Sequence, residues 1–296
     1  MTSAKEAPKK AGHTNYGHLF TGGVAGAVSR SATSPLERLR ILQQTSAAGY
    51  KGLGTVGSLK LMYRNEGMLG FFKGNGATVA KIAPFSAFEF YFYELFKSNL
   101  YPGTPKNKLS YMQKLLCGGL TGVVASTLTY PMDLVKTYLT INQDNAVRVS
   151  MIDQTKIIFR EHGFFGLYKG WGLSMMGIAP FIGIKMSSFD LLSNNFKPSE
   201  EKKNKMIYYN LTNGALAGTI AVTFTYPIDL TRRLLQLNNT PGHSYTGIVD
   251  CCSQLYAKEG FGGFWKGLWA TYLKVAPMTA ILFLCNEQLK RMINIQ

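Results

Sequence analysis

The stretch Pro35-Leu36-Glu37-Arg38-Leu39-Arg40 decides the fold of this chain, because its pattern returns twice. The two further copies read Pro131-Met132-Asp133-Leu134-Val135-Lys136 and Pro227-Ile228-Asp229-Leu230-Thr231-Arg232. Each copy has a proline, an acid two residues later and a base three residues after the acid, and each follows a Gly- and Ala-rich apolar run. The copies are 96 residues apart, so three equal repeats nearly fill the 296-residue chain.

Each copy predicts a kinked helix that carries an acid and a base on one face. Proline inside a helix removes a backbone hydrogen bond and bends the axis. Residues three apart are neighbours on the helix surface. Three such helices around a pseudo-threefold axis would bring three carboxylates and three cations to one level, namely Glu37, Asp133 and Asp229 with Arg40, Lys136 and Arg232.

Six apolar stretches are long enough to cross a bilayer, which takes about 20 residues per helix. They lie at 18–36, 76–96, 114–132, 171–192, 208–230 and 268–289. The mean hydropathy of the chain is zero, which by itself suggests a soluble protein of one or two domains. The charges, however, lie mostly in the connecting segments. Hydropathy alone would make several stretches buried core helices, whereas the repeat favours six membrane spans.

The net charge of +16 comes from 32 basic and 16 acidic residues and implies a partner of negative charge. Nucleic acid is not expected, because Lys and Arg are not gathered on one arm, one domain or a recognised nucleic-acid fold. Cations spread over loops and spans fit anionic lipid surfaces and an anionic solute better.

The sequence has no pattern of an enzyme. Its four cysteines have neither metal-ligand spacing nor a disulfide framework, and its four histidines form no plausible metal or catalytic cluster. A Gly-rich phosphate loop of P-loop spacing is absent. We therefore expect no catalytic residue, no bound metal and no resident cofactor. The N-terminal segment lacks an apolar core, so no secretory signal is expected there.

The triple motif resembles the signature of the mitochondrial carrier family, Pro-x-[Asp/Glu]-x-x-[Lys/Arg], over about residues 17–292. The resemblance implies an all-α membrane protein with six transmembrane helices in three pseudo-threefold repeats, each with a short amphipathic helix on the matrix side. The expected segments are a polar N-terminal tail at 1–16 and carrier repeats at 17–106, 107–203 and 204–296. The implied location is the mitochondrial inner membrane, with several passes and internal targeting.

The resemblance also implies three substrate contact points, seven residues after each Lys-Gly pair. They are Lys81 with its neighbour Ile82, Gly177 with Ile178, and Lys274 with Val275. In the family, a Gly followed by an aliphatic residue at the second point goes with nucleotide-type substrates. A small residue there leaves room for a flat ring, while the two cations hold phosphates.

Two further cations are assigned to the cavity. Arg30 lies in the first span, five residues before the motif proline, and a cation at membrane depth is rarely left facing lipid. Lys185 has two interpretations. It could form an ion pair across the cavity with its repeat equivalent Glu89, or it could be a further phosphate ligand.

The charged ring of the proline motifs is expected to act as the matrix gate. The family's order pairs Glu37 with Lys136, Asp133 with Arg232, and Asp229 with Arg40. Gln43 stands where the family often has a glutamine that braces these pairs. Its repeat equivalents are Leu139 and Leu235, so at most one brace is expected and closure should be comparatively weak.

The far ends of the even-numbered spans are expected to form a cytoplasmic gate. The family motif there is aromatic-acid-x-x-base, which is complete only in the first repeat. The residues that match are Tyr93, Glu94, Lys97, Asp190, Glu287 and Lys290. Two cross-helix pairs remain possible, Asp190 with Lys290 and Glu287 with Lys97. Glu94 is expected to lose its partner, because the second repeat has the neutral Ser193.

An aromatic-base-Gly segment opens each even-numbered span, after an upstream glycine. Unpaired backbone N–H groups at a helix start favour an anion. The resemblance makes these segments cardiolipin sites, and interfacial anchoring by the aromatic and the lysine is a compatible reading. The residues are Gly67, Lys73 and Gly74, then Gly163, Lys169 and Gly170, then Gly260, Lys266 and Gly267.

The run 22–30 and the three contact points look most like the branch of ATP-magnesium/phosphate and coenzyme A carriers, without an EF-hand domain before the repeats. The expected function is exchange of a phosphate-bearing anion by alternating access, with magnesium only as part of a nucleotide substrate. The expected partners are that anion and membrane lipids including cardiolipin, with the protein a monomer. The alternative is a carrier-fold protein without transport activity that serves as a structural subunit of a larger inner-membrane complex.

Overall fold

The computed structural model describes residues 11–47, 49–50, 52–103, 109–142, 149–195, 206–240 and 243–292. The first ten residues of the expected N-terminal tail lie outside these ranges. Within them the chain is helical, joined by turns and short loops, and its only β contact is an isolated bridge between Thr240 and His243. The expectation of an all-α fold is confirmed.

The helices repeat in the order long, short, long. In the first repeat, two consecutive helices, α1 and α2, take the place of the first long helix. The first repeat contains α1 (Ala11–Ala32), α2 (Ser34–Gln44), α3 (Thr55–Gly70) and α4 (Asn75–Leu100). The second contains α5 (Tyr111–Ile141), α6 (Met151–Gly166) and α7 (Trp171–Asn195). The third contains α8 (Met206–Gln236), α9 (Ile248–Glu259), the 3-10 helix η3 (Phe261–Trp265) and α10 (Leu268–Met292).

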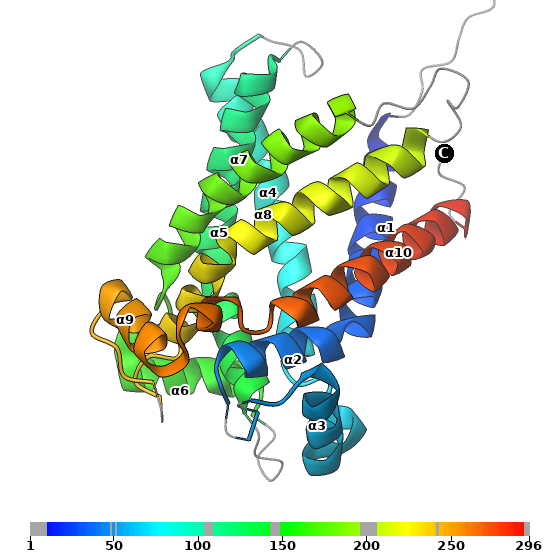
Figure 1. The fold of residues 1–296 in the computed structure, drawn as a ribbon. Coiled ribbons are helices and arrows are strands. Elements are labelled where there is room, and N and C mark those ends of the chain that lie inside the picture. The colour runs from blue at the N-terminus through cyan, green and yellow to red at the C-terminus, as the bar shows by residue number, and fades with distance from the viewer. Residues whose placement is uncertain are drawn as a thin grey trace, which may run out of the picture.

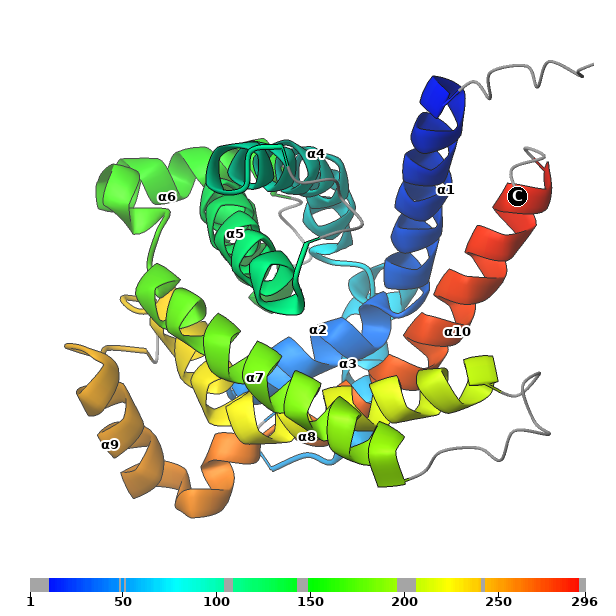
Figure 2. The same ribbon diagram turned by 90° about the horizontal axis from the view of Figure 1, so that it is seen from above.

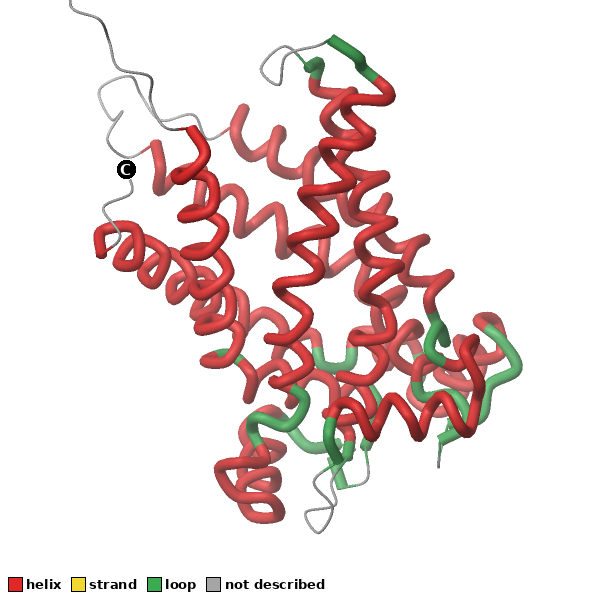
Figure 3. Tube along the Cα trace, turned by 180° about the vertical axis from the view of Figure 1, so that it is seen from behind, coloured by secondary structure: helices red, strands yellow, loops and turns green. Residues whose placement is uncertain are grey.

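The long helices pair across the repeat boundaries. The most extensive contacts join α4 to α5, α7 to α8, and α10 back to α1, and these three pairs are separate in the view from above (Figure 2). The short helices α3, α6 and α9 lie at one end of the long helices (Figures 1 and 3). At this end α2, α5 and α8 also contact one another. We call it the ring end, and the other end the opposite end.

The motif prolines act differently in the three repeats. In the first repeat the helix breaks at Thr33, whose backbone has φ −96° and ψ 5°, and α2 then starts with Pro35 in its first turn. The hydroxyl of Thr33 donates to the carbonyl of Ser29 at 2.9 Å. Pro131 and Pro227 instead lie inside α5 and α8, which remain continuous helices. The equivalent hydroxyls of Thr129 and Thr225 make the same bond in the continuous helices, both at 2.8 Å, so this bond does not account for the break in the first repeat.

Each repeat has its own buried cluster at the ring end. In the second repeat, Tyr130 and Leu134 of α5 pack against Ile158 of α6, and in the third, Leu230 and Leu234 of α8 pack against Leu255 of α9. The cluster of the first repeat consists of Leu39, Leu42, Tyr50 and Met62, packed together with Ala270 of the third repeat. Burial of these side chains holds the short helices against the long ones.

The long helices carry many exposed apolar side chains, including Phe90, Leu128, Leu191, Phe224 and Leu284. A protein face of this kind fits hydrocarbon rather than water. By length and hydropathy alone, three helices of the described residues are long and apolar enough to cross a membrane. They are Met112–Ile141, Trp171–Asn195 and Phe261–Met292. Hydropathy alone thus identifies three of the six expected spans among the described residues.

The glycine before each of the helices α4, α7 and α10 has a left-handed backbone and lies against the next repeat. Gly74 has φ +83°, and a Cβ placed there would collide with the Thr140 hydroxyl and come within 3.3 Å of the Lys136 carbonyl oxygen. Gly170 and Gly267 make the corresponding contacts with the carbonyl oxygens of Arg232 and Arg40. These glycines let successive repeats approach closely at the ring end.

We expect Gly74→Ala to destabilise the protein by about 2–4 kcal/mol, since a left-handed alanine costs about 1–2 kcal/mol and overpacking about 1–3 kcal/mol. Gly67→Ala is the matched control, because Gly67 has φ +66° but no atom within 4 Å of the added Cβ. Thermal unfolding in detergent should show the larger fall for Gly74→Ala. Equal falls would mean that the contact with the second repeat is unimportant.

The loop before α9 contains a titratable group whose pKa the fold lowers. Burial, and then the positive charge of Lys258, lower the pKa of His243 below its ordinary value of 6.5. Its Nδ1 lies 3.2 Å from the hydroxyl of Tyr245. The unfolded chain therefore takes up a proton on this histidine at a higher pH than the folded chain does. Stability contributed by neutral His243 is lost as the pH falls below about 6.5.

We expect the melting temperature to fall between pH 7.5 and pH 5.5 by more in the natural protein than in a His243→Gln variant, which cannot titrate at this position. Thermal unfolding of both proteins at the two pH values measures the difference. A parallel fall in both would assign the pH dependence to other groups.

Candidate functional site

The proline motifs form a closed ring of ion pairs between successive repeats. Lys136 Nζ lies 3.1 Å from Glu37 Oε1, Arg232 Nη2 3.5 Å from Asp133 Oδ2, and Arg40 Nη2 3.0 Å from Asp229 Oδ2. All three predicted pairings are therefore present. They connect α2 with α5, α5 with α8, and α8 with α2, and so close the ring end.

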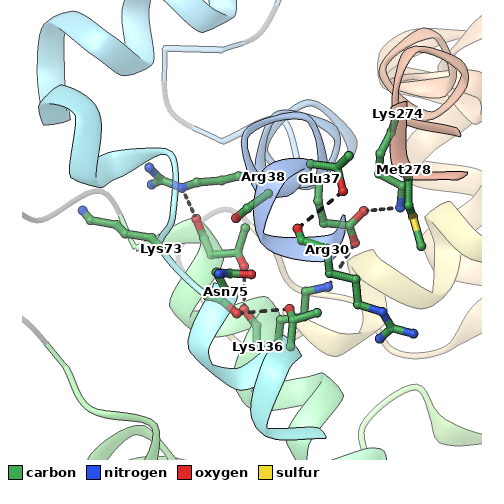
Figure 4. Close-up of a pocket in the computed structure, with 13 residues that line it drawn as sticks. Arg30, Glu37, Arg38, Lys73, Asn75, Lys136, Lys274 and Met278 are labelled. Atoms are coloured by element: carbon green, nitrogen blue, oxygen red, sulfur yellow. Dashed lines mark hydrogen bonds and ion pairs between the residues drawn. The ribbon is translucent and has the colours of Figure 1, made fainter. Parts of the chain in front are cut away.

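Two cavity lysines also reach the ring. Lys81 of α4 places its Nζ 2.7 Å from Asp133 Oδ2, and Lys274 of α10 places its Nζ 2.7 Å from Glu37 Oε2. Lys274 and Lys136 approach Glu37 from two sides, as Figure 4 shows. Sequence reasoning placed these lysines in the cavity above the ring but did not predict their bonds to its carboxylates.

The arginines of the ring lie against tyrosines. The guanidinium of Arg232 is 5.4 Å from the ring centroid of Tyr130, and that of Arg40 is 5.6 Å from the centroid of Tyr226. Both tyrosine hydroxyls donate to backbone carbonyls, of Lys169 at 2.7 Å and of Lys266 at 2.9 Å. Tyr130 thereby connects the ring to the segment that starts α7, and Tyr226 connects it to the segment that starts α10.

The predicted glutamine brace is one residue out of register. Gln43 donates to the hydroxyl of Ser58 at 3.4 Å and, among the described residues, makes no hydrogen bond to the ring. The glutamine that contacts it is Gln236, whose Nε2 donates to the Tyr130 hydroxyl at 3.1 Å and whose Oε1 accepts from Thr137 at 2.8 Å. Its repeat equivalents are Gln44 and Thr140, both buried. The statement that at most one glutamine occupies this level is therefore wrong.

Sequence reasoning missed two arginines at the ring end. Arg233 donates to the Thr137 hydroxyl at 2.7 Å and to Gln236 Oε1 at 3.3 Å. Arg38 is 1% exposed and lies 2.8 Å from Glu66 Oε2, while its Nε donates to the Thr140 carbonyl at 3.0 Å. The only available signal was that Arg38, inside the motif, and Arg233, directly after it, are bases whose repeat equivalents are uncharged.

Two cavities adjoin the ring. One, of about 480 Å³, is lined by Lys81, Gly177, Ile178, Phe85 and Phe181, among others, and its floor includes Asp229 and Arg232. The other, of about 210 Å³, is lined by Arg30, Lys136 and Lys274 together with Glu37. Figure 4 shows Arg30 beside Glu37 and the two lysines that bind it. Among the described residues Arg30 makes no recorded ion pair.

Several candidate residues are not brought together. Ile82 and Val275 lie next to the contact lysines but do not line either cavity. Glu89 and Lys185 are both exposed, and no ion pair between them is found in the described part of the chain. The cross-cavity pair is therefore not formed in this conformation, which leaves Lys185 as a solvent-accessible cation of α7.

The opposite end has no cross-helix ring within the described ranges. Lys97 lies 3.9 Å from Glu94 in its own helix α4, and Glu287 binds Arg291 of α10 at 2.5 Å. The two possible pairs, Glu287 with Lys97 and Asp190 with Lys290, are not formed among the described residues in this conformation, in which the ring end is closed, so the cytoplasmic gate stays a prediction. Charges one turn apart on a single helix can pair without the helix ends converging. In the part of the chain that the structure describes, ion pairs thus join the repeats at the ring end and not at the opposite end.

The aromatic-base-Gly segments use their lysines at the repeat boundaries. Lys73 donates to the Asn142 carbonyl at 3.2 Å, Lys169 to the Asn238 carbonyl at 2.8 Å, and Lys266 to the Ser46 hydroxyl at 2.7 Å. Burial lowers the pKa of Lys169 from its ordinary value. These contacts give the lysines a structural role, and a lipid role for the segments stays a prediction.

Comparison with known proteins agrees with this triple architecture. The family model described as mitochondrial carrier protein matches residues 12–103, 107–200 and 203–296. The chain belongs to the mitochondrial carrier family. As a mitochondrial carrier it is a membrane transporter of solutes and not an enzyme.

Relatives of this carrier include transporters of nucleotides and of coenzyme A. The mitochondrial carrier protein CoAc2 of Zea mays is 35% identical, with 92% of this chain and 85% of the relative covered. The mitochondrial adenine nucleotide transporter ADNT1 of Arabidopsis thaliana is 35% identical, with 94% and 87% covered. The mitochondrial coenzyme A transporter SLC25A42 of Xenopus laevis is 31% identical, with 92% and 85% covered.

Proposed function

We propose that this carrier exchanges a phosphate-bearing anion of the adenine nucleotide, ATP-magnesium/phosphate or coenzyme A type across the mitochondrial inner membrane. The observation that carries the proposal is the group of three cavity cations, Arg30, Lys81 and Lys274, above the closed ring. Charge-assisted hydrogen bonds from such cations to phosphoryl oxygens are among the stronger polar contacts in proteins. The names of the relatives support the same substrate class.

The larger cavity supports a place for the flat part of the substrate. Gly177 and Ile178 line it together with Phe85 and Phe181, so one wall is apolar and partly aromatic. A planar ring system can stack or pack on such a wall while its phosphates reach Lys81, which lines the same cavity. Inorganic phosphate has no planar ring system and would bind through the cations alone.

Transport then proceeds by alternating access. The conformation described is closed at the ring end and lacks the cross-helix pairs of the opposite end in the described ranges, which fits a carrier that receives solute from the opposite end. Buried ion pairs contribute little net stability because desolvation offsets their attraction. Binding energy that the solute gains only as the ring loosens can therefore drive opening.

Lipid is the other proposed ligand. The helix starts after Gly74, Gly170 and Gly267 present backbone N–H groups that favour an anionic headgroup. Cardiolipin bound there would stabilise the boundaries between repeats. No resident cofactor is proposed, and magnesium would enter only with a nucleotide.

Reconstitution of the purified protein into cardiolipin-containing liposomes tests the proposal. Vesicles loaded in turn with ATP, ADP, phosphate or coenzyme A are assayed for exchange against each of the four outside, with and without magnesium. We expect saturable exchange of at least one phosphate-bearing pair. Absence of exchange for all pairs, with the protein recovered in a large complex on native gels, would favour the structural-subunit alternative instead.

A further inference from the structure

Three boundaries join the repeats at the ring end, and they share most of their contacts. We call them the first boundary (repeats one and two), the second (repeats two and three) and the third (repeats three and one). Each has one ion pair of the ring, and each has the lysine of an aromatic-base-Gly segment bonded near the end of α5, α8 or α2. When the contacts of α10 with both α1 and α2 are included, helix packing is also similar at the three boundaries. Differences between the boundaries therefore arise from contacts that have no repeat equivalent.

The first boundary has such a contact in Arg38 of α2. Its Nε donates to the Thr140 carbonyl at 3.0 Å and its Nη2 to the Asn142 carbonyl at 3.2 Å, and both carbonyls belong to the end of α5 or the residue after it. The guanidinium is fixed from the other side by Glu66 of α3, 2.8 Å away, and both charged side chains are 1% exposed. A hydrogen bond shielded from water in this way is electrostatically stronger than one at the surface. Arg38 therefore ties α2 and α3 to the end of α5.

The second boundary has a different contact of this kind, made by Arg233 of α8. Arg233 donates to the Thr137 hydroxyl of α5 at 2.7 Å, and Thr137 in turn donates to Gln236 Oε1 at 2.8 Å. Gln236 Nε2 donates to the Tyr130 hydroxyl at 3.1 Å, which brings the network back to α5. Thr137 and Gln236 are fully buried. All acceptors in this network are neutral, so it does not depend on the carboxylates of the ring.

The third boundary has apolar residues at both equivalent positions. Leu230 stands in the place of Arg38 and Ile41 in the place of Arg233, and both are fully buried. Across this boundary Ser46 accepts from Lys266 at 2.7 Å and donates to Glu259 at 3.0 Å. These two charged side chains are 22% and 15% exposed, so water competes for them. Within the described residues, the third boundary thus has no counterpart of the two arginine contacts.

The third boundary also differs in how the chain crosses it. The chain runs on from α4 to α5 and from α7 to α8, so a backbone segment connects the repeats at the first and second boundaries. The helices α10 and α1 are the last and the first of the described chain, and they meet side by side without a connecting segment between them (Figure 2). The third boundary is therefore held by non-covalent contacts alone.

We infer that the ring end opens unequally: the first and third repeats separate from each other, while Arg38 and Arg233 keep the other two boundaries together. The inference rests on the proposed function, because alternating access requires the ring end to open, and it adds which repeats separate. Bonds from an arginine to buried neutral acceptors remain when the ion pairs of the ring part, whereas the partly exposed contacts of Ser46 do not resist water in the same way. The solute then passes beside α2 and α8, at the third boundary.

Reversible cross-links at three matched positions test this inference. In a full-length carrier whose four cysteines are replaced by serine, cysteine pairs are introduced at 73 and 142 for the first boundary, 169 and 238 for the second, and 46 and 266 for the third. These are equivalent positions, and each pair is in contact in the structure. A short bifunctional thiosulfonate links each pair, a reductant removes the link, and exchange in liposomes is measured before linking, after linking and after reduction.

We expect the link at the third boundary to lower exchange by about tenfold or more, since a carrier that cannot open cannot turn over, and the other two links to leave it within about twofold. In an Arg233→Gln background the third link should inhibit less, because the second boundary can then separate in its place. A purely structural role of Arg233 predicts no such relief. Equal inhibition by all three links, or no inhibition by the third, would overturn the inference.

Hydrogen exchange of the natural protein in detergent provides a second test that needs no transport. The last turns of α2, α5 and α8 lie at the third, first and second boundaries, respectively. Local opening at the weakest boundary lowers the protection of its amides, so we expect the smallest protection factors in the last turn of α2. Protection there that equals or exceeds that of α5 and α8 would contradict unequal opening. If no unlinked carrier exchanges any solute, the proposed function fails, and hydrogen exchange still decides which boundary is the weakest.

Discussion

Replacing Lys81 with alanine should reduce exchange of the transported nucleotide or coenzyme A by about 10- to 100-fold. A hydrogen bond to a charged group contributes about 1.5–3 kcal/mol, and 1.4 kcal/mol is a factor of ten. Lys274→Ala should have an effect of similar size, and the double variant a larger one. Initial rates in liposomes of matched protein content measure the loss.

The control for this experiment is Lys60→Ala, because Lys60 is an exposed cation of α3 that lines neither cavity. It should exchange at the natural rate. Each variant must elute as the natural protein does, so that a lower rate reports the site and not misfolding. Natural exchange rates in both Lys81→Ala and Lys274→Ala would show that the substrate site has been assigned to the wrong cations.

Replacing Arg38 with leucine should destabilise the carrier by about 3–5 kcal/mol, the usual effect of removing one partner of a buried ion pair. Arg38 and Glu66 are each 1% exposed and lie 2.8 Å apart. Arg38 also donates to the carbonyl oxygens of Gly70, Thr140 and Asn142. Leucine leaves Glu66 with Lys73 alone, at 2.6 Å. Thermal unfolding in detergent should show a melting temperature lower by about 10 °C.

Removing both charges should be milder than removing one. Arg38→Leu with Glu66→Leu replaces the pair by apolar side chains, which is often close to neutral. Glu287→Gln is the surface control, because Glu287 and Arg291 are 61% and 69% exposed, and such a pair contributes about 0–1 kcal/mol. If the double variant lost as much stability as Arg38→Leu alone, the buried pair would not be the reason for the loss.

The ring could be predicted from the sequence because its residues recur at a fixed spacing. Equal spacing places Glu37, Asp133 and Asp229 at one level without any knowledge of distances. The bonds of Lys81 and Lys274 to the ring could not be predicted in this way. These bonds depend on how closely α4 and α10 pack against the neighbouring helices, and the spacing of the repeats in the sequence does not give that distance.

The register error at Gln43 has a geometric cause. A helix turns about 100° per residue, so seven residues from Glu37 lead to Gln44 on nearly the same face, whereas six lead to Gln43 well off it. Two adjacent glutamines made the choice ambiguous in the sequence, and the Leu equivalents of Gln43 were the sign that it belonged to the core-facing side.

The opposite end was harder to predict for a physical reason. Its motifs are degenerate at Ser193 and Asn286, and its pairs form only when the helix ends converge. Arg38 was missed because its partner Glu66 lies in another helix, and the equivalent positions, Leu134 and Leu230, carry no charge. Interactions unique to one repeat leave no periodic signal.

The pairing of α4 with α5, α7 with α8, and α10 with α1 means that each repeat packs its long helices mainly against a neighbouring repeat and less against each other. Two of these pairs join helices that follow one another in the chain, whereas α1 pairs with the last helix, α10, and this pair can form only after the whole chain has been synthesised. An isolated repeat could cover the same faces only by joining two identical copies in a circle. The arrangement is that of a trimer whose three subunits have been joined into one polypeptide.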